Sequence, residues 1–208
     1  MSAIFDWARS ENLQPEPITL DIWRDLPEDF CRQVEVVNGE AIRAESATRP
    51  HQKAARRLAN LLEAAAETHM RQHQDGCLDV DTDFDVLLWE LPRVSIRRPD
   101  VALFDCAPED LRPLPASMIK LTVEIVSPGS EKTDTAVKKA EYAMAGIPWY
   151  WIVWVSDNRV TSIETYVLDH VLGQYRSHVV FEPADTESVV ELPVRMRIDW
   201  SRLANLVR

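Results

Sequence analysis

A glutamate stands in the middle of an apolar run. Residues 121–126 read LTVEIV, and Glu124 is the one charged side chain among them. The run predicts a buried strand, in which a carboxylate is costly unless a partner satisfies its charge. Glu124 therefore needs a partner, which can be a lysine, a metal ion or a purely structural group.

Asp100 is a second acidic residue in a similar position. It follows Pro99 directly and precedes the apolar run VALF. If its strand neighbours that of Glu124, the two carboxylates converge at one sheet edge, where they repel each other and need a cation. Mg²⁺ takes oxygen ligands and commonly uses one or two protein carboxylates, so the pair is compatible with a magnesium site. In the structural alternative, Asp100 caps a turn and Glu124 forms a salt bridge with a lysine.

The segment after Glu124 supplies a set of polar residues at helical spacing. Asp134, Lys138 and Tyr142 lie at i, i+4 and i+8, which places them along one helical face. A lysine on that face can reach Glu124, and Lys139, about a third of a turn away, competes for this role. Carboxylates that hold a metal, together with an ammonium that stabilises charge on a phosphate, are what metal-dependent phosphodiester hydrolysis needs. The alternative for Asp134 and Lys138 is a solvated ion pair that contributes little.

Helices and strands must position these side chains. A β-hairpin is expected at 33–44, where Asn38-Gly39 forms a favoured two-residue turn. Pro50 suits the first turn of an amphipathic helix at 49–73. Further strands are expected at 84–91, 100–105, 120–127, 149–155, 160–169 and 173–183, and further helices at 130–146 and 198–207. The order of these elements predicts an α/β fold with a central mixed β-sheet flanked by helices.

The composition is that of one globular domain. The chain has 208 residues, 46% of them hydrophobic, with seven tryptophans, which is enough to bury a sizeable core. No apolar stretch reaches the length of a membrane span, and the N-terminus lacks the pattern of a secretory signal, so we expect a cytoplasmic protein without a membrane partner. The single domain (1–208) is expected to divide into an N-terminal arm (1–17), a core (18–170) and C-terminal strands with a short helix (171–208).

The cysteines give a further expectation about redox state. Cys31, Cys77 and Cys106 are odd in number and widely spaced. No Cys-x-x-Cys pair indicates zinc. Each cysteine is therefore expected to be a reduced, buried side chain, in keeping with a cytoplasmic protein.

The net charge, two histidines and three tryptophans give expectations about binding partners. The net charge of −11 argues against broad, non-specific nucleic-acid binding but leaves room for a local basic groove. His69 and His73 have the spacing of metal ligands, but they fall at the polar end of a helix, where a solvated helix end is expected. Trp149, Trp151 and Trp154 are expected in the core or on the face of a homodimer.

The motifs, taken in their order along the chain, resemble a known family. Residues 20–170 contain VEVVNGEAI, RPHQKAARRLANLL, RRPDVALF, LTVEIVSP and DTAVKKAEYAMAGIPWYWIV. In this combination the chain resembles the Uma-type endonucleases, a bacterial group of the PD-(D/E)xK restriction-endonuclease-like superfamily. The resemblance implies a restriction-endonuclease-like core and an endonuclease that uses Mg²⁺, or Mn²⁺, to hydrolyse phosphodiester bonds in nucleic acid, DNA in preference to RNA.

The resemblance also implies roles for five residues. Asp100 and Glu124 match metal ligands, and Glu35 matches an additional acidic ligand or a residue beside the metal. Lys138 matches the catalytic lysine, which stabilises the phosphate or lowers the pKa of the attacking water. His51 matches a position that contacts the scissile phosphate or a water held by the metal.

Three of these assignments have competitors. The superfamily lysine usually stands two residues after the glutamate, where this chain has Val126, and Lys138 instead resembles a variant in which the lysine lies on the following helix. Glu40 competes with Glu35, which can also be an ordinary outward strand residue. His51 can simply satisfy backbone groups near a helix start.

Three classes of function are therefore open. The first is a metal-dependent nuclease, and the second is a catalytically inactive nuclease fold that binds nucleic acid or a protein partner. The third is a structural homodimer whose carboxylates pair with Arg97 and Arg98. A basic groove beside the acidic cluster favours the nuclease, whereas a uniformly negative rim favours the binding module.

Overall fold

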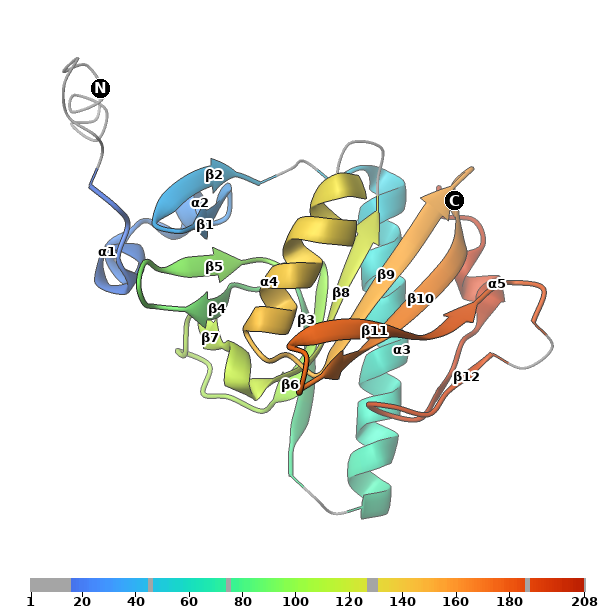
Figure 1. Cartoon of the computed structure of the whole chain (residues 1–208). Helices are drawn as coiled ribbons and strands as arrows, with labels where there is room; N and C mark the ends of the chain where they lie inside the picture. The colour runs from blue at the N-terminus through green and yellow to red at the C-terminus, as the bar shows by residue number, and fades with distance from the viewer. Residues whose placement is uncertain (1–15, 45–46, 74–75, 127–130, 186–187, 208) are drawn as a thin grey trace.

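Strand β8 (Ile119–Val126) lies inside the main sheet, as the apolar run predicted (Figure 1). β8 pairs in parallel with β9, and the other neighbouring strands of this six-stranded sheet are antiparallel, so the sheet is mixed. In spatial order its strands are β11 (Gln174–Phe181), β10 (Arg159–Asp169), β9 (Trp149–Ser156), β8, β6 (Val101–Asp105) and β3 (Leu78–Thr82).

The computed structural model describes residues 16–44, 47–73, 76–126, 131–185 and 188–207. All but the last two residues of the predicted N-terminal arm lie outside the described residues, as does the first residue of the helix expected at 130–146.

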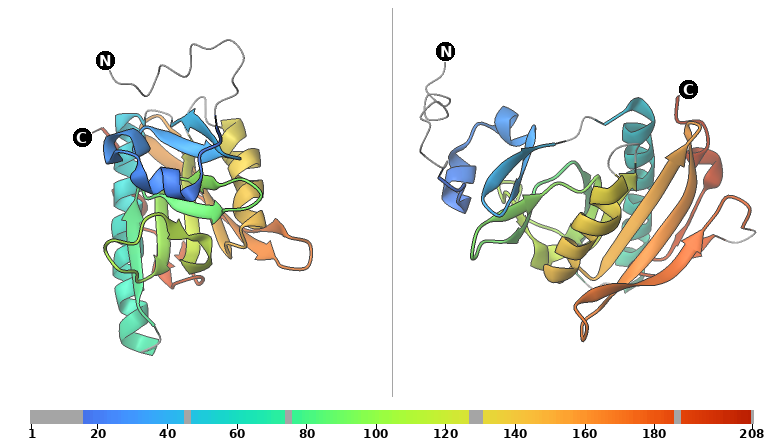
Figure 2. Two further views of the ribbon diagram at one scale, coloured as in Figure 1. Left: turned by 90° about the vertical axis from the view of Figure 1, so that its left-hand side faces the viewer. Right: turned by 45° about the horizontal axis from the view of Figure 1, so that its top comes forward.

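Helices cover both faces of the main sheet (Figures 1 and 2). α3 (Arg49–His73) lies on one face and packs against the odd-numbered residues of 121–125. The π-helical segment Thr133–Lys138 and α4 (Lys139–Met144), which follow one another directly, lie on the other face. Successive side chains of a strand point to opposite faces, so Glu124 points to the α4 side. The predicted fold class is confirmed.

The long helix has the register that its sequence predicted. Among the apolar residues at helical spacing along it, Ala54, Leu58, Leu62 and Ala65 are buried and Leu61 is half-buried. Alanine and leucine are strong helix formers, and the small alanines let the helix approach the sheet closely. The first turn of this helix consequently lies beside the main sheet near the start of β6.

A second sheet lies beside the main one. In spatial order it contains β2 (Glu40–Arg43), β1 (Val34–Val37), β5 (Ser95–Arg97), β4 (Val86–Trp89) and β7 (Leu114–Pro115). The predicted turn Asn38-Gly39 joins β1 to β2, and both residues have the positive φ that a two-residue hairpin turn requires. The sequence predicted one central sheet and missed β3 and β5. Which sheet a short strand joins depends on distant partners, such as Val36 with Ile96, and a local pattern does not reveal them.

Short elements complete the chain. They are α1 (Leu20–Asp25), α2 (Glu28–Cys31), a 3₁₀ turn (Ala116–Met118), the paired strands β12 (Val189–Val190) and β13 (Met196–Arg197), and α5 (Trp200–Leu203). The closing helix predicted within 198–207 is therefore present, although shorter. None of the helices in the described residues is long and apolar enough to cross a membrane.

The cysteine prediction was wrong for two of the three residues. Cys77 and Cys106 are exposed and form a disulfide, with their Cα atoms 5.2 Å apart. They stand at the end of the antiparallel β3–β6 pair, directly beyond the partners Leu78 and Asp105. Strand pairing thus joins cysteines that are 29 residues apart, which their spacing alone does not reveal. Cys31 is buried and free, as predicted.

We predict that the disulfide stabilises the fold. Replacing both Cys77 and Cys106 with serine should lower the free energy of unfolding by up to about 3–4 kcal/mol, because the closed loop of some 30 residues no longer restricts the unfolded chain. Urea denaturation would measure this change. A reducing agent should shift the midpoint of the wild type and leave that of the double variant unchanged. Equal stability of the two proteins under oxidising conditions would contradict the prediction.

Candidate active site

Glu124 has two partners from the helical segment above it. Its side chain is only 1% exposed. One carboxylate oxygen accepts a hydrogen bond from Lys138 Nζ at 3.0 Å, and the other accepts one from the Tyr142 hydroxyl at 2.6 Å. Both donors project from the helical face that the sequence predicted, although the turn that contains Lys138 is a π-helix and not an α-helix. Such wide turns occur frequently at functional sites.

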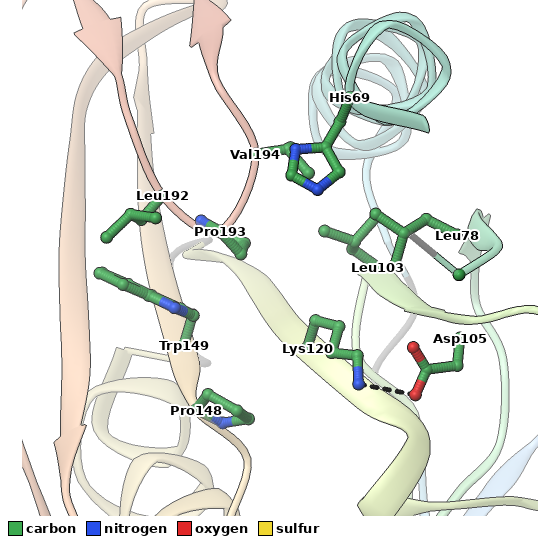
Figure 3. Close-up of a pocket in the computed structure, with 11 residues that line it drawn as sticks. His69, Leu78, Leu103, Asp105, Lys120, Pro148, Trp149, Leu192, Pro193 and Val194 are labelled. Carbon is green, nitrogen blue, oxygen red and sulfur yellow. Dashed lines mark hydrogen bonds and ion pairs between the residues drawn. The ribbon is translucent and has the colours of Figure 1, made fainter. Parts of the chain in front are cut away.

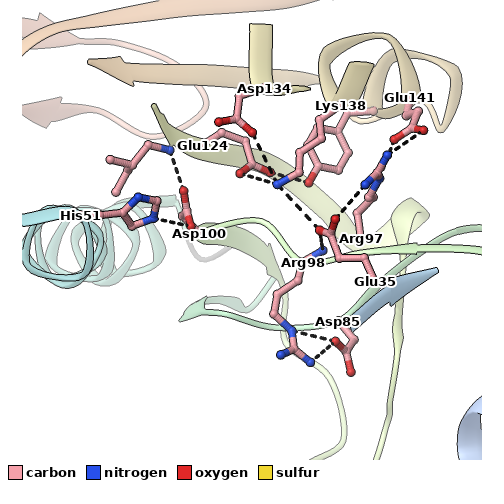
Figure 4. A network of polar contacts seen from close by, with 12 residues as sticks. Glu35, His51, Asp85, Arg97, Arg98, Asp100, Glu124, Asp134, Lys138 and Glu141 are labelled. Atoms are coloured by element: carbon pink, nitrogen blue, oxygen red, sulfur yellow. Dashed lines mark hydrogen bonds and ion pairs between the residues drawn. The ribbon is translucent and has the colours of Figure 1, made fainter. Parts of the chain in front are cut away.

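Lys138 is surrounded by carboxylates (Figure 4). Its ammonium lies 3.0 Å from Glu124, 3.6 Å from Asp134 and 3.7 Å from Glu35. Burial lowers the pKa of Lys138, but these negative charges raise it by more, so the ammonium stays protonated. Lys139 points elsewhere, with its Nζ 3.3 Å from the centre of the Tyr166 ring.

Asp100 lies beside Glu124, as the sequence predicted. In the β6–β8 pair, Val101 is opposite Val123, so the next residue outward on each strand, Asp100 and Glu124, is also opposed. One Asp100 oxygen accepts a hydrogen bond from the Ile125 backbone N–H at 2.6 Å. The other lies 2.8 Å from His51 Nε2, which the first turn of α3 supplies. Two strands and one helix therefore converge on this point.

Glu35 reaches the same cluster from the second sheet. One of its oxygens accepts a hydrogen bond from the Arg98 backbone N–H at 2.9 Å, and the other accepts one from Arg97 Nη1 at 2.7 Å. Arg97 is only 2% exposed and also donates two hydrogen bonds to Glu141, at 2.6 and 3.0 Å. Glu40, the competing candidate, is exposed on β2. The structure therefore brings Glu35 to the cluster and fixes it by two arginines.

A neighbouring ion-pair group was not predicted from the sequence. Arg98 and Arg112 both bind Asp85, whose side chain is almost fully buried. Asp85 directly precedes β4, so this group ties the second sheet to the loop before β7. The Arg-Arg-Pro-Asp sequence at 97–100 partly indicated this ion-pair group, because two adjacent arginines beside a buried strand need acidic partners.

The charge balance at Glu124 favours an additional cation. Burial raises the pKa of Glu124 well above its ordinary value; Lys138 opposes this rise, and the carboxylates of Asp100 and Asp134 add to it. Four carboxylates, those of Glu35, Glu124, Asp134 and Glu141, share two permanent cations, Lys138 and Arg97, and Asp100 beside them contacts His51.

The donor set fits a small, hard divalent ion. Within the described residues, no three His, Cys, Asp or Glu side chains are grouped as a metal site. Mg²⁺, however, usually takes one or two carboxylates and completes its shell with water and substrate phosphate. Asp100 and Glu124, opposed on neighbouring strands, supply oxygen donors of this kind. The residues present therefore fit a magnesium-type site that is completed by substrate.

The histidine and tryptophan signals lie outside this cluster. His69 and His73 stack on each other near the end of α3, with ring centres 4.3 Å apart. Trp151 is fully buried in the core, and Trp154 is half-buried and donates a hydrogen bond to Glu164. Trp149 lines a separate pocket.

That pocket lies at the other end of β8 (Figure 3). It has a volume of about 360 Å³. Among its polar groups, Lys120 and Asp105 pair with each other at 2.6 Å, and His69 also lines the pocket. Lys120 stands four residues before Glu124 on the strand, about 13 Å away at the usual rise per residue. Most of the lining is apolar, including Leu103, Trp149 and Leu192, so the pocket is distinct from the carboxylate cluster.

Comparisons with known proteins identify a family and a similar fold. Residues 23–201 match the Uma2 family model, whose description is "Putative restriction endonuclease". A crystal structure from Anabaena variabilis ATCC 29413, described as a putative nuclease belonging to DUF820, has a similar fold with a TM-score of 0.59. The two chains are 17% identical, and the match covers 85% of this chain and 90% of that chain. No curated protein matched the sequence.

We predict that Asp100 controls the protonation of His51. Burial lowers the pKa of His51, but the hydrogen bond and charge of Asp100, together with the charges of Asp83 and Asp134, raise it above its ordinary value of 6.5. In Asp100→Asn the pKa of His51 should fall, because burial then acts without this compensating charge. NMR titration in the presence of a chelator would measure it, with Glu40→Gln on the exposed hairpin as the control. An unchanged His51 titration in Asp100→Asn would contradict the assignment.

We also predict that Arg97 is essential to the stability of the cluster. Arg97→Met should lower the free energy of unfolding by about 3–5 kcal/mol, because Glu35 and Glu141 lose the cation between them. Arg24→Met is the matched control, since Arg24 forms only an exposed pair with Asp21 and should cost less than about 1 kcal/mol. Urea denaturation of both variants would decide. Similar losses in the two variants would show that the Arg97 pairs do not stabilise the fold.

Proposed function

The chain belongs to the Uma2 family, and we propose that it is a metal-dependent nuclease that hydrolyses phosphodiester bonds in DNA. The observation that supports this proposal most is the convergence of Asp100, Glu124 and Lys138. Two carboxylates on neighbouring strands and one buried ammonium meet there. This combination supplies oxygen donors for a cation and a positive charge for a phosphate.

Asp100 and Glu124 would hold Mg²⁺, or Mn²⁺, through their carboxylates. A divalent ion bound there would polarise the phosphate and lower the pKa of the attacking water. Both carboxylates are aligned before any ligand arrives: the Ile125 N–H fixes Asp100, and the Tyr142 hydroxyl fixes Glu124. Such alignment reduces the reorganisation required when the substrate binds.

Lys138 would donate to the phosphate oxygens as negative charge develops on them. Its three carboxylate neighbours keep it protonated, so it acts as a cation and not as a base. Glu35 and Asp134 would then orient the ammonium. For Glu35, the contacts with Arg97 and Arg98 favour this role beside the metal over direct ligation.

His51 would act beside Asp100. Its Nε2 already contacts a carboxylate oxygen of Asp100, at 2.8 Å, so it can hold that side chain in place or donate a proton toward the phosphate. Preference for DNA over RNA, assembly as a homodimer and a cytoplasmic location stay predictions from the sequence.

We predict that Lys138 contributes to the reaction and not to metal binding. Lys138→Met should reduce Mg²⁺-dependent DNA cleavage about 10²- to 10³-fold, the usual effect of losing one group that stabilises the transition state. Calorimetry should show that Lys138→Met still binds the metal, whereas Asp100→Asn and Glu124→Gln lose it. Cleavage would be followed with Mg²⁺ and with Mn²⁺.

Lys139→Met provides the control for this experiment. Lys139 is adjacent in sequence but lies over Tyr166, so its loss should leave cleavage nearly unchanged. Equal rates for the two lysine variants would exclude the assigned role of Lys138. A wild-type protein that binds DNA but cleaves nothing with either metal would instead support the binding-module alternative.

A further inference from the structure

The first half of α3 is basic in an otherwise acidic chain. Arg49, Lys53, Arg56 and Arg57 lie within nine residues, and no Asp or Glu occurs from residue 46 to residue 62. With 100° per residue, these four side chains point away from the stripe that packs on the sheet. Arg49 and Arg56 are exposed, and Lys53 and Arg57 are half-buried. They form one continuous cationic surface, which we term the α3 basic face.

The four cations lie close enough to affect one another. Burial, as the largest cause, lowers the pKa of Lys53, and the charges of Arg57, Arg49 and Arg56 lower it further. Mutual repulsion of this kind favours the approach of an anion, which would relieve it.

The arginines of the α3 basic face differ in their ion pairing from other exposed arginines of the protein. Arg71, near the end of the same helix, pairs with Glu67, and Arg195 pairs with Glu191. Among the residues that the structure describes, no carboxylate forms a salt bridge with Arg49, Arg56 or Arg57. An ordinary solvated helical face would carry both signs of charge, as the second half of α3 does with Glu63, Glu67 and Arg71.

The α3 basic face is also adjacent to the candidate active site. His51, which contacts Asp100, projects from the inner side of α3 (Figure 4). Arg49 and Lys53 lie in the same turns of this helix. A helix with its side chains is about 10–12 Å across. Successive phosphates of one DNA strand advance about 3.4 Å along the duplex axis, so the width of the helix corresponds to about three base pairs of a duplex.

We propose that the α3 basic face is the surface on which the phosphate backbone of substrate DNA docks. The inference rests on the proposed nuclease function and specifies where the substrate lies beyond the scissile phosphate. Positive charge beside an acidic cluster compensates for the repulsion that the cluster and the net charge of −11 exert on a polyanion.

The test separates docking from chemistry. A triple variant, Arg49→Gln/Lys53→Gln/Arg56→Gln, removes three charges and leaves Arg57, which donates to the Arg202 carbonyl and helps to hold α5. Binding of a short DNA duplex would be measured by fluorescence anisotropy over a series of salt concentrations, in a chelator so that no cleavage occurs. Hydrolysis of bis(4-nitrophenyl) phosphate with Mn²⁺ would report the chemistry alone. Arg71→Gln is the matched control on the same helix.

We expect the triple variant to bind DNA roughly tenfold more weakly or worse at moderate salt, and the slope of log K against log salt to fall by about 2–3, since each lost phosphate contact removes about 0.9. Arg71→Gln should bind like the wild type. Hydrolysis of the small ester should be the same in all three proteins.

Two results would overturn the inference: unchanged DNA affinity and slope in the triple variant, or an equal loss in Arg71→Gln. A wild type that does not bind DNA at low salt would overturn it as well. Failure of the nuclease proposal would be seen separately, as the absence of metal-dependent hydrolysis of both DNA and the small ester, whatever the binding data show.

Discussion

A carboxylate inside the main sheet is the constraint on which the rest of the site depends. Glu124 is buried, so it needs a donor and a cation, and Tyr142 and Lys138 supply them. The buried ammonium of Lys138 in turn needs acidic neighbours, one of which is Glu35, and Glu35 needs Arg97. Removing one partner from a buried ion pair costs about 3–5 kcal/mol. Each charge therefore fixes the position of the next, and the resulting set is rigid before any ligand binds.

The second sheet contributes Glu35 and Arg97 to the cluster around Glu124. β1 carries Glu35 and β5 ends at Arg97, and neither strand pairs with the main sheet. Arg97 is the last residue of β5, and Arg98, Pro99 and Asp100 lead from it into β6. These four consecutive residues therefore connect the two sheets, and they carry side chains of the cluster. Arg97 and Arg98 do pair with carboxylates, as the structural alternative expected. Their partners, however, are Glu35, Glu141 and Asp85, while Asp100 contacts His51 and Glu124 contacts Lys138. Structural ion pairs and a candidate catalytic pair thus coexist.

Charge is distributed unevenly over the molecule. Although the net charge is −11, the acidic cluster is buried and the first half of α3 has a basic outward surface. A polyanion approaching the molecule encounters the local surface within about a Debye length, roughly 10 Å, more strongly than the total charge. The net negative charge is therefore a weaker argument against a nucleic-acid substrate than the composition alone suggested.

The sequence by itself determined the elements that local physics governs. Apolar residues that recur about every 3.6 positions in 49–73 determined α3, and the Asn-Gly pair determined the hairpin. The apolar run around Glu124 determined a buried strand with one charge that needed a partner. The motif order also identified the family and five residues that the fold brings together: Glu35, His51, Asp100, Glu124 and Lys138.

Only the tertiary structure decided which distant groups meet. It gave Glu35 two arginine partners, divided the strands between two sheets, and joined Cys77 to Cys106. Each of these outcomes depends on strand register and on packing between segments far apart in the chain. Local sequence patterns report propensity and which face a side chain occupies, but the register of long-range pairing follows from burying all the elements together.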